Sequence, residues 1–169
     1  MSARLSTIEE ALDALKAGRP VLVTDDEDRE NEGDVILAGA TATTEWMAWT
    51  IRHTSGYICV PMSEARADRL GLPLMVADNQ DPRHTAYTVT VDAAQGVSTG
   101  ISAADRAHTI RLLAQEDSIP SNFNRPGTRG SVARQARRGP RSRRAHGGGG
   151  GSVPPRRPGA GGRDRRARP

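Results

Sequence analysis

The stretch that decides how this chain is interpreted lies between two short apolar runs, Val21–Thr24 and Val35–Ala38. It reads Asp25-Asp26-Glu27-Asp28-Arg29-Glu30-Asn31-Glu32-Gly33-Asp34, and seven of these ten residues are carboxylates. Crowded carboxylates repel one another unless solvent or a cation screens them. Composition alone therefore leaves two interpretations open: a solvated acidic loop, or a site for a hard cation such as Mg²⁺ or Mn²⁺. The spacing of the acids excludes an EF-hand.

The charge of the chain is divided between two unlike parts. Residues 1–127 hold 11 Lys and Arg against 19 Asp and Glu, whereas residues 128–169 hold 13 Arg and a single acid. The last part also contains ten Gly and five Pro, but only Val132 and Val153 as large aliphatic residues. Because such a segment buries too little apolar surface to offset its ordering entropy, we expect 1–127 to fold and 128–169 to be disordered.

Other counts narrow the class of protein. One cysteine excludes an internal disulfide and a tetrahedral cysteine zinc site. No run of about 18 apolar residues exists, so no membrane span is expected. The N-terminal residues show no apolar signal-peptide region, and we expect a protein of the cytoplasm.

Local patterns predict a fold that mixes helices with short strands. Capping residues and apolar spacing favour helices after Ser6, from Thr44, from Ser63 and from Ser102. Apolar and β-branched runs favour strands at 21–24, 35–38, 57–60 and 87–92. The expected class is α+β, an α/β-type mixed sheet with flanking helices.

Two further features have weaker functional interpretations. Cys59 lies between Ile58 and Val60, where a cysteine is more often a small buried hydrophobe than a nucleophile. The segment Gly96–Ser102 precedes a predicted helix and could bind an oxyanion through its backbone N–H groups. It matches neither a Walker loop nor a dinucleotide fingerprint.

Taken in order, five stretches resemble the 3,4-dihydroxy-2-butanone 4-phosphate synthase family of riboflavin biosynthesis. The acidic segment carries the family's signature, and the resemblance covers nearly all of residues 5–127. The other matching stretches are Ile51–Gly56 continuing into Cys59–Met62, Tyr87–Asp92, Gly96–Arg106 and Asn124–Gly127.

The resemblance implies a lyase that converts D-ribulose 5-phosphate into 3,4-dihydroxy-2-butanone 4-phosphate and formate with Mg²⁺ or Mn²⁺. It also implies a homodimer with active sites near the interface. By match to the family's motifs, Glu30 is a metal ligand, and Arg29, Glu30 and Asp34 contact the sugar phosphate. Asp25, Glu32 and Cys59 are implied to line the catalytic site.

The resemblance ends after Gly127. The family continues with a histidine and a strand, and later with a Gly-His-Thr-Glu-Ala motif that supplies a second metal ligand and a phosphate-holding threonine. Here Gly127 is followed by Thr128-Arg129-Gly130 and the Arg/Gly/Pro-rich segment. With suitable synonymous codons, 145–157 read one base later spell His-Thr-Glu-Ala-Ala-Val-Asp-Leu-Cys-Arg-Leu-Ala, the missing motif and the helix after it. We therefore interpret 128–169 as a frameshifted version of the family's C-terminal portion.

Three functions follow as expectations. The first is a synthase by descent whose activity is lost with the C-terminal motifs. The second is a non-catalytic protein whose basic tail binds polyanions without sequence specificity, since no aromatic residue lies between the arginines. The third is an inactive partner of an intact synthase.

Overall fold

A computed structural model describes residues 5–26, 31–82 and 85–128 of the chain. The chain divides into two units, 1–138 and 139–169, and all the described residues belong to the first. The segment 128–169, which we expect to be disordered and out of frame, lies outside the described residues except for Thr128.

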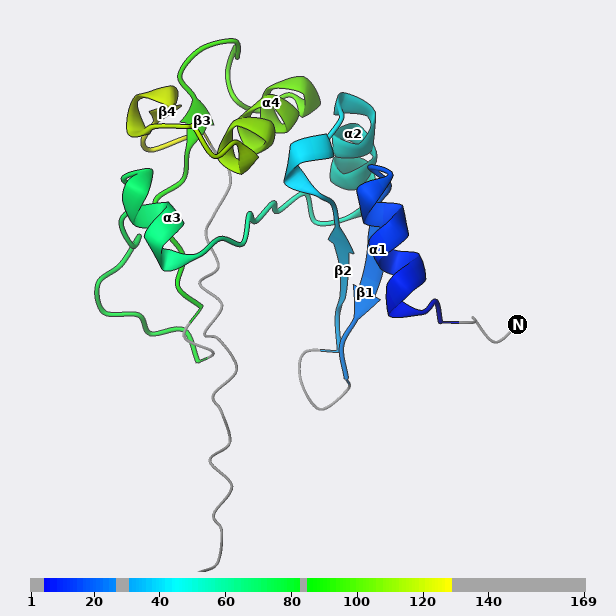
Figure 1. Ribbon diagram of the computed structural model, residues 1–169. Coiled ribbons are helices and arrows are strands. Elements are labelled where there is room, and N and C mark those ends of the chain that lie inside the picture. Colours follow the sequence, from blue (N-terminus) through cyan, green and yellow to red (C-terminus); the bar gives the residue numbers. More distant parts are fainter. Residues whose placement is uncertain (1–4, 27–30, 83–84, 129–169) are drawn as a thin grey trace, which may run out of the picture. The chain divides into compact units, whose positions relative to one another are not determined.

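The described residues form four α-helices, two short 3₁₀ helices and four short strands (Figure 1). In chain order the elements are α1 (Ile8–Lys16), β1 (Val21–Thr24), β2 (Gly33–Ile36), η1 (Gly39–Thr41), α2 (Thr44–His53), α3 (Glu64–Arg69), β3 (Asp92–Ala93), α4 (Ala103–Ala114), η2 (Pro120–Asn122) and β4 (Phe123–Asn124). The α+β class is confirmed. Within the described ranges the strands pair as two separate antiparallel sheets, β1 with β2 and β3 with β4.

The helices begin within one residue of their predicted starts. At the start of α1 the capping box joins Thr7 to Glu10, one residue later than the predicted Ser6, and α2 is capped by Thr43 instead of Thr44. The side chains of Thr43, Ser63 and Ser102 each accept a hydrogen bond from the third residue of the helix that follows. Each cap satisfies a backbone N–H that has no partner within its helix, so these starts are specified locally.

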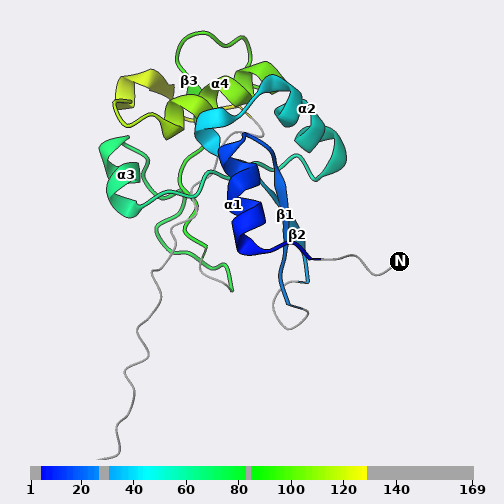
Figure 2. The ribbon, with the colours of Figure 1, turned by 45° about the vertical axis from the view of Figure 1, so that its right-hand side comes forward.

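The buried core lies among α2, α3, α4 and the extended segments between them. Its members are Ala42, Met47, Ile58, Ala67, Leu70, Leu72, Val91, Ala107, Ile110, Leu113 and Phe123. By contrast, α1, β1 and β2 contain no fully buried residue, although α1 packs beside β1 (Figure 2). The β1–β2 hairpin thus stands at the edge of the core, with Leu22 and Val23 exposed.

The predicted strand at 87–92 forms less regular structure than its composition suggests. Its backbone makes an isolated bridge between Thr88 and Leu74, and Thr90 O accepts a hydrogen bond from Gly127 N, but only Asp92 continues into β3. The segment 57–60 is likewise extended without belonging to a named strand. Strand propensity makes a segment extended, but a ladder also needs a neighbouring strand.

Candidate active site

The acidic segment forms the connection of the β1–β2 hairpin. Thr24 pairs with Gly33, and the pairing continues beyond the strands, because Asp25 N donates to Glu32 O at 3.2 Å. Asp25 Oδ1 in turn accepts from Glu32 N at 2.7 Å. Residues 27–30 lie outside the described ranges, and with them Arg29 and Glu30. Since side chains alternate along a strand, Glu32 and Asp34 project to the same side of the hairpin.

Glu32 and Asp34 line a cavity of about 560 Å³, which we call the carboxylate cavity. One wall comes from the hairpin and the other from the C-terminal half of α2 with the turn after it. The lining residues are Leu22, Glu32, Gly33, Asp34, Val35, Trp49, Thr50, His53, Thr54, Ser55 and Tyr57. Two carboxylate residues thus line the same cavity as an imidazole, three threonine or serine hydroxyls and two aromatic rings.

The wall from α2 is ordered by short local contacts. Trp49 and His53, one helical turn apart, have ring centroids separated by 4.9 Å. Thr54 ends the helix, and its Oγ1 donates to Thr50 O at 2.7 Å while accepting from Gly56 N at 3.1 Å. His53 lies in the last turn of α2.

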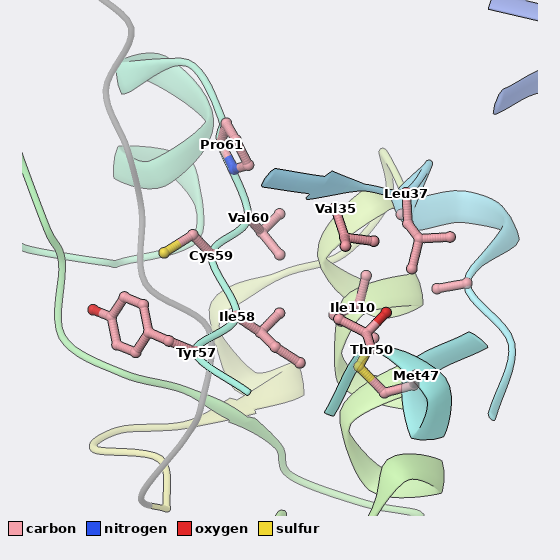
Figure 3. Close-up of a pocket in the computed structure, with 12 residues that line it drawn as sticks. Val35, Leu37, Met47, Thr50, Tyr57, Ile58, Cys59, Val60, Pro61 and Ile110 are labelled. Carbon is pink, nitrogen blue, oxygen red and sulfur yellow. The ribbon is translucent and has the colours of Figure 1, made fainter. Parts of the chain in front are cut away.

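Cys59 lies on the extended segment that leads away from this turn. Figure 3 shows Ile58 and Val60 directed into an apolar cavity with Val35 and Ile110, whereas the side chains of Tyr57 and Cys59 are directed to the other side. This apolar cavity has a volume of about 200 Å³. Burial raises the pKa of the Cys59 thiol, and the nearby Asp34 carboxylate raises it further. Neither influence favours the thiolate, the reactive form of cysteine.

The segment Gly96–Ser102 uses part of its hydrogen-bonding capacity internally. Asp105, in the first turn of α4, accepts from Ser98 Oγ at 2.9 Å, Ser98 N at 3.3 Å and Gly100 N at 3.1 Å. Burial raises the pKa of Asp105, but the hydrogen bonds it accepts, chiefly from Ser98, outweigh this and lower the pKa below its usual value. The expectation that this segment offers its N–H groups to an external oxyanion is therefore wrong for Ser98 and Gly100.

The site residues predicted from the sequence therefore do not all lie in one cavity. Glu32 and Asp34 meet in one cavity, Asp25 supports the base of the hairpin connection, and Cys59 borders the apolar cavity. Sequence reasoning did not assign Trp49, Thr54, Ser55 or Tyr57 to a site. The available signal was the run of hydroxyl residues directly after α2, which gives a helix end with exposed polar groups.

The donor atoms suit a hard divalent cation, because carboxylate oxygens are the ligands such ions prefer. Among the described residues, no group of three or more His, Cys, Asp or Glu side chains could hold a metal ion. Glu32 and Asp34 supply two carboxylates, and the predicted ligand Glu30 belongs to the part of the hairpin connection that is not described.

Comparison with known proteins identifies the class. The sequence profile of the 3,4-dihydroxy-2-butanone 4-phosphate synthase family matches residues 9–148. The riboflavin biosynthesis protein RibBA of Salinispora arenicola is 62% identical over 121 residues, which is 72% of this chain and 29% of that protein. RibBA of Nocardia farcinica is 59% identical over 124 residues, with 73% and 30% covered.

Solved structures agree with the sequence matches. A 3,4-dihydroxy-2-butanone 4-phosphate synthase in complex with two magnesium ions superposes with a TM-score of 0.75 and 48% identity, covering 79% of this chain and 61% of that one. The Candida albicans synthase gives a TM-score of 0.68 and 50% identity, covering 78% and 62%. This chain therefore belongs to the 3,4-dihydroxy-2-butanone 4-phosphate synthase family, a family of lyases in riboflavin biosynthesis.

The chain spans under a third of the length of the RibBA proteins that it matches, and less than two thirds of the solved synthases. In the described part of the chain, no helix combines the length and apolarity that crossing a bilayer requires.

Proposed function

We propose that residues 1–127 form the carboxylate-bearing N-terminal part of a synthase domain that acts on D-ribulose 5-phosphate. The observation that carries this proposal is the cavity in which Glu32 and Asp34 face the end of α2, within a chain of this family. Its hydroxyl, imidazole and carboxylate groups are suited to hydrogen-bonding a polyhydroxylated substrate. The family membership also leads us to propose a homodimer.

The proposed roles divide between holding the sugar and moving protons. Arg29 and Asp34 hold hydroxyl groups of the sugar phosphate, and Glu32 and Asp25 accept and return protons as general bases and acids. The hydrogen bond from Glu32 N to Asp25 Oδ1 supports this division, because it holds the Asp25 carboxylate next to Glu32. Cys59 borders the neighbouring apolar cavity, where burial and the Asp34 carboxylate raise the pKa of its thiol. Mg²⁺ or Mn²⁺ held by Glu30 would, when bound, acidify the C–H beside the sugar carbonyl.

We also propose that this chain binds the metal without completing the reaction. The family's second metal ligand, its phosphate-holding threonine and its later acid are missing from residues 128–169, which we interpret as out of frame. Catalytic groups that act as a unit lose most of their effect when one part is removed. The magnesium-bound relative supports Mg²⁺ as the ion.

The experiment compares the purified 169-residue chain with a version whose reading frame is restored after Gly127. Formate release from ribulose 5-phosphate with Mg²⁺ is expected only from the restored protein. Calorimetric titration with Mn²⁺ should show uptake by the restored protein that Glu30→Gln abolishes. Turnover by the 169-residue chain would overturn the proposed loss of activity, and Mn²⁺ uptake independent of Glu30 would overturn the proposed site.

A further inference from the structure

The first turn of α4 holds two loops that lie far apart in the sequence. Arg106 Nε donates to Ile101 O at 2.9 Å, and its Nη1 donates to Gly56 O at 3.0 Å. The preceding residue, Asp105, accepts from the N–H groups of Ser98 and Gly100. Two neighbouring side chains of this helical turn therefore hold both loops. Asp105 and Arg106 bind the 97–101 loop through its N–H groups and the Ile101 carbonyl, and Arg106 also binds the turn after α2 through the Gly56 carbonyl.

The turn after α2 is the segment that forms one wall of the carboxylate cavity. Within it, Thr54 Oγ1 accepts from Gly56 N, and Ser55 Oγ accepts from Tyr57 N at 3.2 Å. These bonds shape the turn itself but do not fix its position relative to the rest of the molecule. Gly56 has a φ of 70°, a left-handed conformation suited to glycine, and its carbonyl meets Arg106.

The guanidinium group of Arg106 is suited to holding two backbone carbonyl groups in fixed positions. Its N–H donors lie in one plane in fixed directions, so two carbonyl acceptors bound to it are held at a set separation. Hydrogen bonds from a charged donor are also stronger than neutral ones. A lysine has one ammonium group on a flexible stem and does not impose the same geometry.

We propose that Arg106 is a positioning residue for the candidate active site: it fixes Ser55 and Tyr57 opposite Glu32 and Asp34 by joining their turn to the 97–101 loop. The expected effect of Arg106 on the binding of a sugar phosphate rests on the proposed function. Its expected effect on the position of the turn does not.

Arg111 provides a matched control. It lies on the same helix and also donates to a distant backbone carbonyl, Ala42 O, at 2.7 Å. Ala42 borders the apolar cavity and is not among the residues that line the carboxylate cavity. Arg106→Gln and Arg111→Gln therefore remove similar bonds at different places.

Hydrogen exchange of the full 169-residue chain tests the positioning directly. Arg106→Gln should raise exchange at least about tenfold at Gly56, Tyr57, Ser98 and Gly100, a change equivalent to about 1.4 kcal/mol of local protection. Arg106→Lys, which keeps the charge but not the fork, should give a smaller increase at the same amides. Arg111→Gln should leave these amides at the wild-type rate. Equal exchange in the Arg106 and Arg111 variants would overturn the proposal. If Arg106→Gln does not fold, the same comparison is made between Arg106→Lys and Arg111→Gln.

A second measurement links the turn to binding. Ribulose 5-phosphate, added with Mg²⁺, is titrated against tryptophan fluorescence, since Trp49 lines the cavity. Arg106→Gln should weaken binding of the sugar phosphate at least about tenfold, whereas Arg111→Gln, compared at a similar thermal midpoint, should not. Unchanged affinity in Arg106→Gln would overturn the role of Arg106 in the site. If the wild-type chain binds no sugar phosphate, the titration is repeated on the version with the restored reading frame. Absence of binding there too means that the proposed function fails, and the exchange experiment still decides whether Arg106 positions the turn.

Discussion

At the scale of single residues, two buried threonines differ in how their hydroxyl groups are satisfied. Thr109 Oγ1 accepts from Ala93 N at 3.0 Å and donates to Asp105 O at 3.0 Å, and the residue is 2% exposed. Thr50 Oγ1 is buried with no hydrogen-bond partner among the described residues. Replacement by valine should therefore affect stability differently at the two positions.

Thr109→Val leaves a buried N–H of Ala93 without an acceptor, and we expect it to lower the free energy of unfolding by about 1–3 kcal/mol. Thr50→Val removes a polar group that makes no bond, so stability should stay the same or rise by up to about 1 kcal/mol. Urea denaturation followed by circular dichroism measures both values. A larger loss for Thr50→Val than for Thr109→Val would contradict this account.

Asp105 should make stability depend on acid pH. Its pKa is lowered in the folded state, because the hydrogen bonds from the 98–100 backbone and from Ser98 Oγ outweigh burial. A carboxyl whose pKa is lowered by folding stabilises the protein above its unfolded pKa of about 3.9, and this contribution is lost as pH falls through the folded pKa. Wild type should therefore lose stability below about pH 4 more steeply than Asp105→Asn. Urea midpoints at pH 7, 5, 4 and 3 test this, and parallel curves for the two proteins would refute it.

At the scale of elements, α3 and the end of α4 are joined by one side chain. The Arg66 guanidinium donates to Glu116 O at 3.0 Å and to Leu113 O at 3.1 Å, and also to Gln115 O. These carbonyls lie at and just beyond the C-terminus of α4, where helix carbonyls lack partners within the helix. Arg66 thus caps α4 from a different helix.

Arg66→Gln should cost about 2 kcal/mol of stability, because it removes charge-assisted bonds to several carbonyls at once. Arg69→Gln on the same helix is the control, since Arg69 is exposed and should change stability by less than about 0.5 kcal/mol. Equilibrium unfolding in urea measures both variants. Equal effects would show that Arg66 does not hold the end of α4.

At the scale of the whole molecule, the chain joins an acidic part to a basic one. Residues 1–127 carry a net charge of −8 and residues 128–169 one of +12. The net charge of +4 for the whole chain therefore describes neither part. Any binding to polyanions should reside in the basic part, whereas divalent cations should be taken up by the acidic one.

Removing residues 129–169 should abolish retention on heparin and its dependence on salt. The truncation keeps Thr128, whose N–H donates to Asp92 Oδ2 at 2.6 Å. Mn²⁺ uptake measured by calorimetry should be the same in the full and truncated chains. Retention on heparin after truncation would place the polyanion site in the acidic part and contradict the division of charge.

The sequence by itself determined the features that depend on neighbouring residues. The capped helix starts, the acidic connection between two strands and the unequal charge all follow from residues close together in the chain. The helix positions held because caps and apolar spacing act within a few residues. The family followed as well, since the acidic segment and the glycine-rich loop before α4 are local motifs.

Only the tertiary structure decided which distant groups meet. It brought Glu32 and Asp34 opposite the turn after α2, turned the N–H groups of the 97–101 loop toward Asp105, and left most of 87–92 extended without a regular ladder. Each of these outcomes depends on partners far along the chain, which local propensity does not specify. Hydrogen bonds such as that from Arg106 to Gly56 O span fifty residues, and the chain makes them only when packing brings the two segments together.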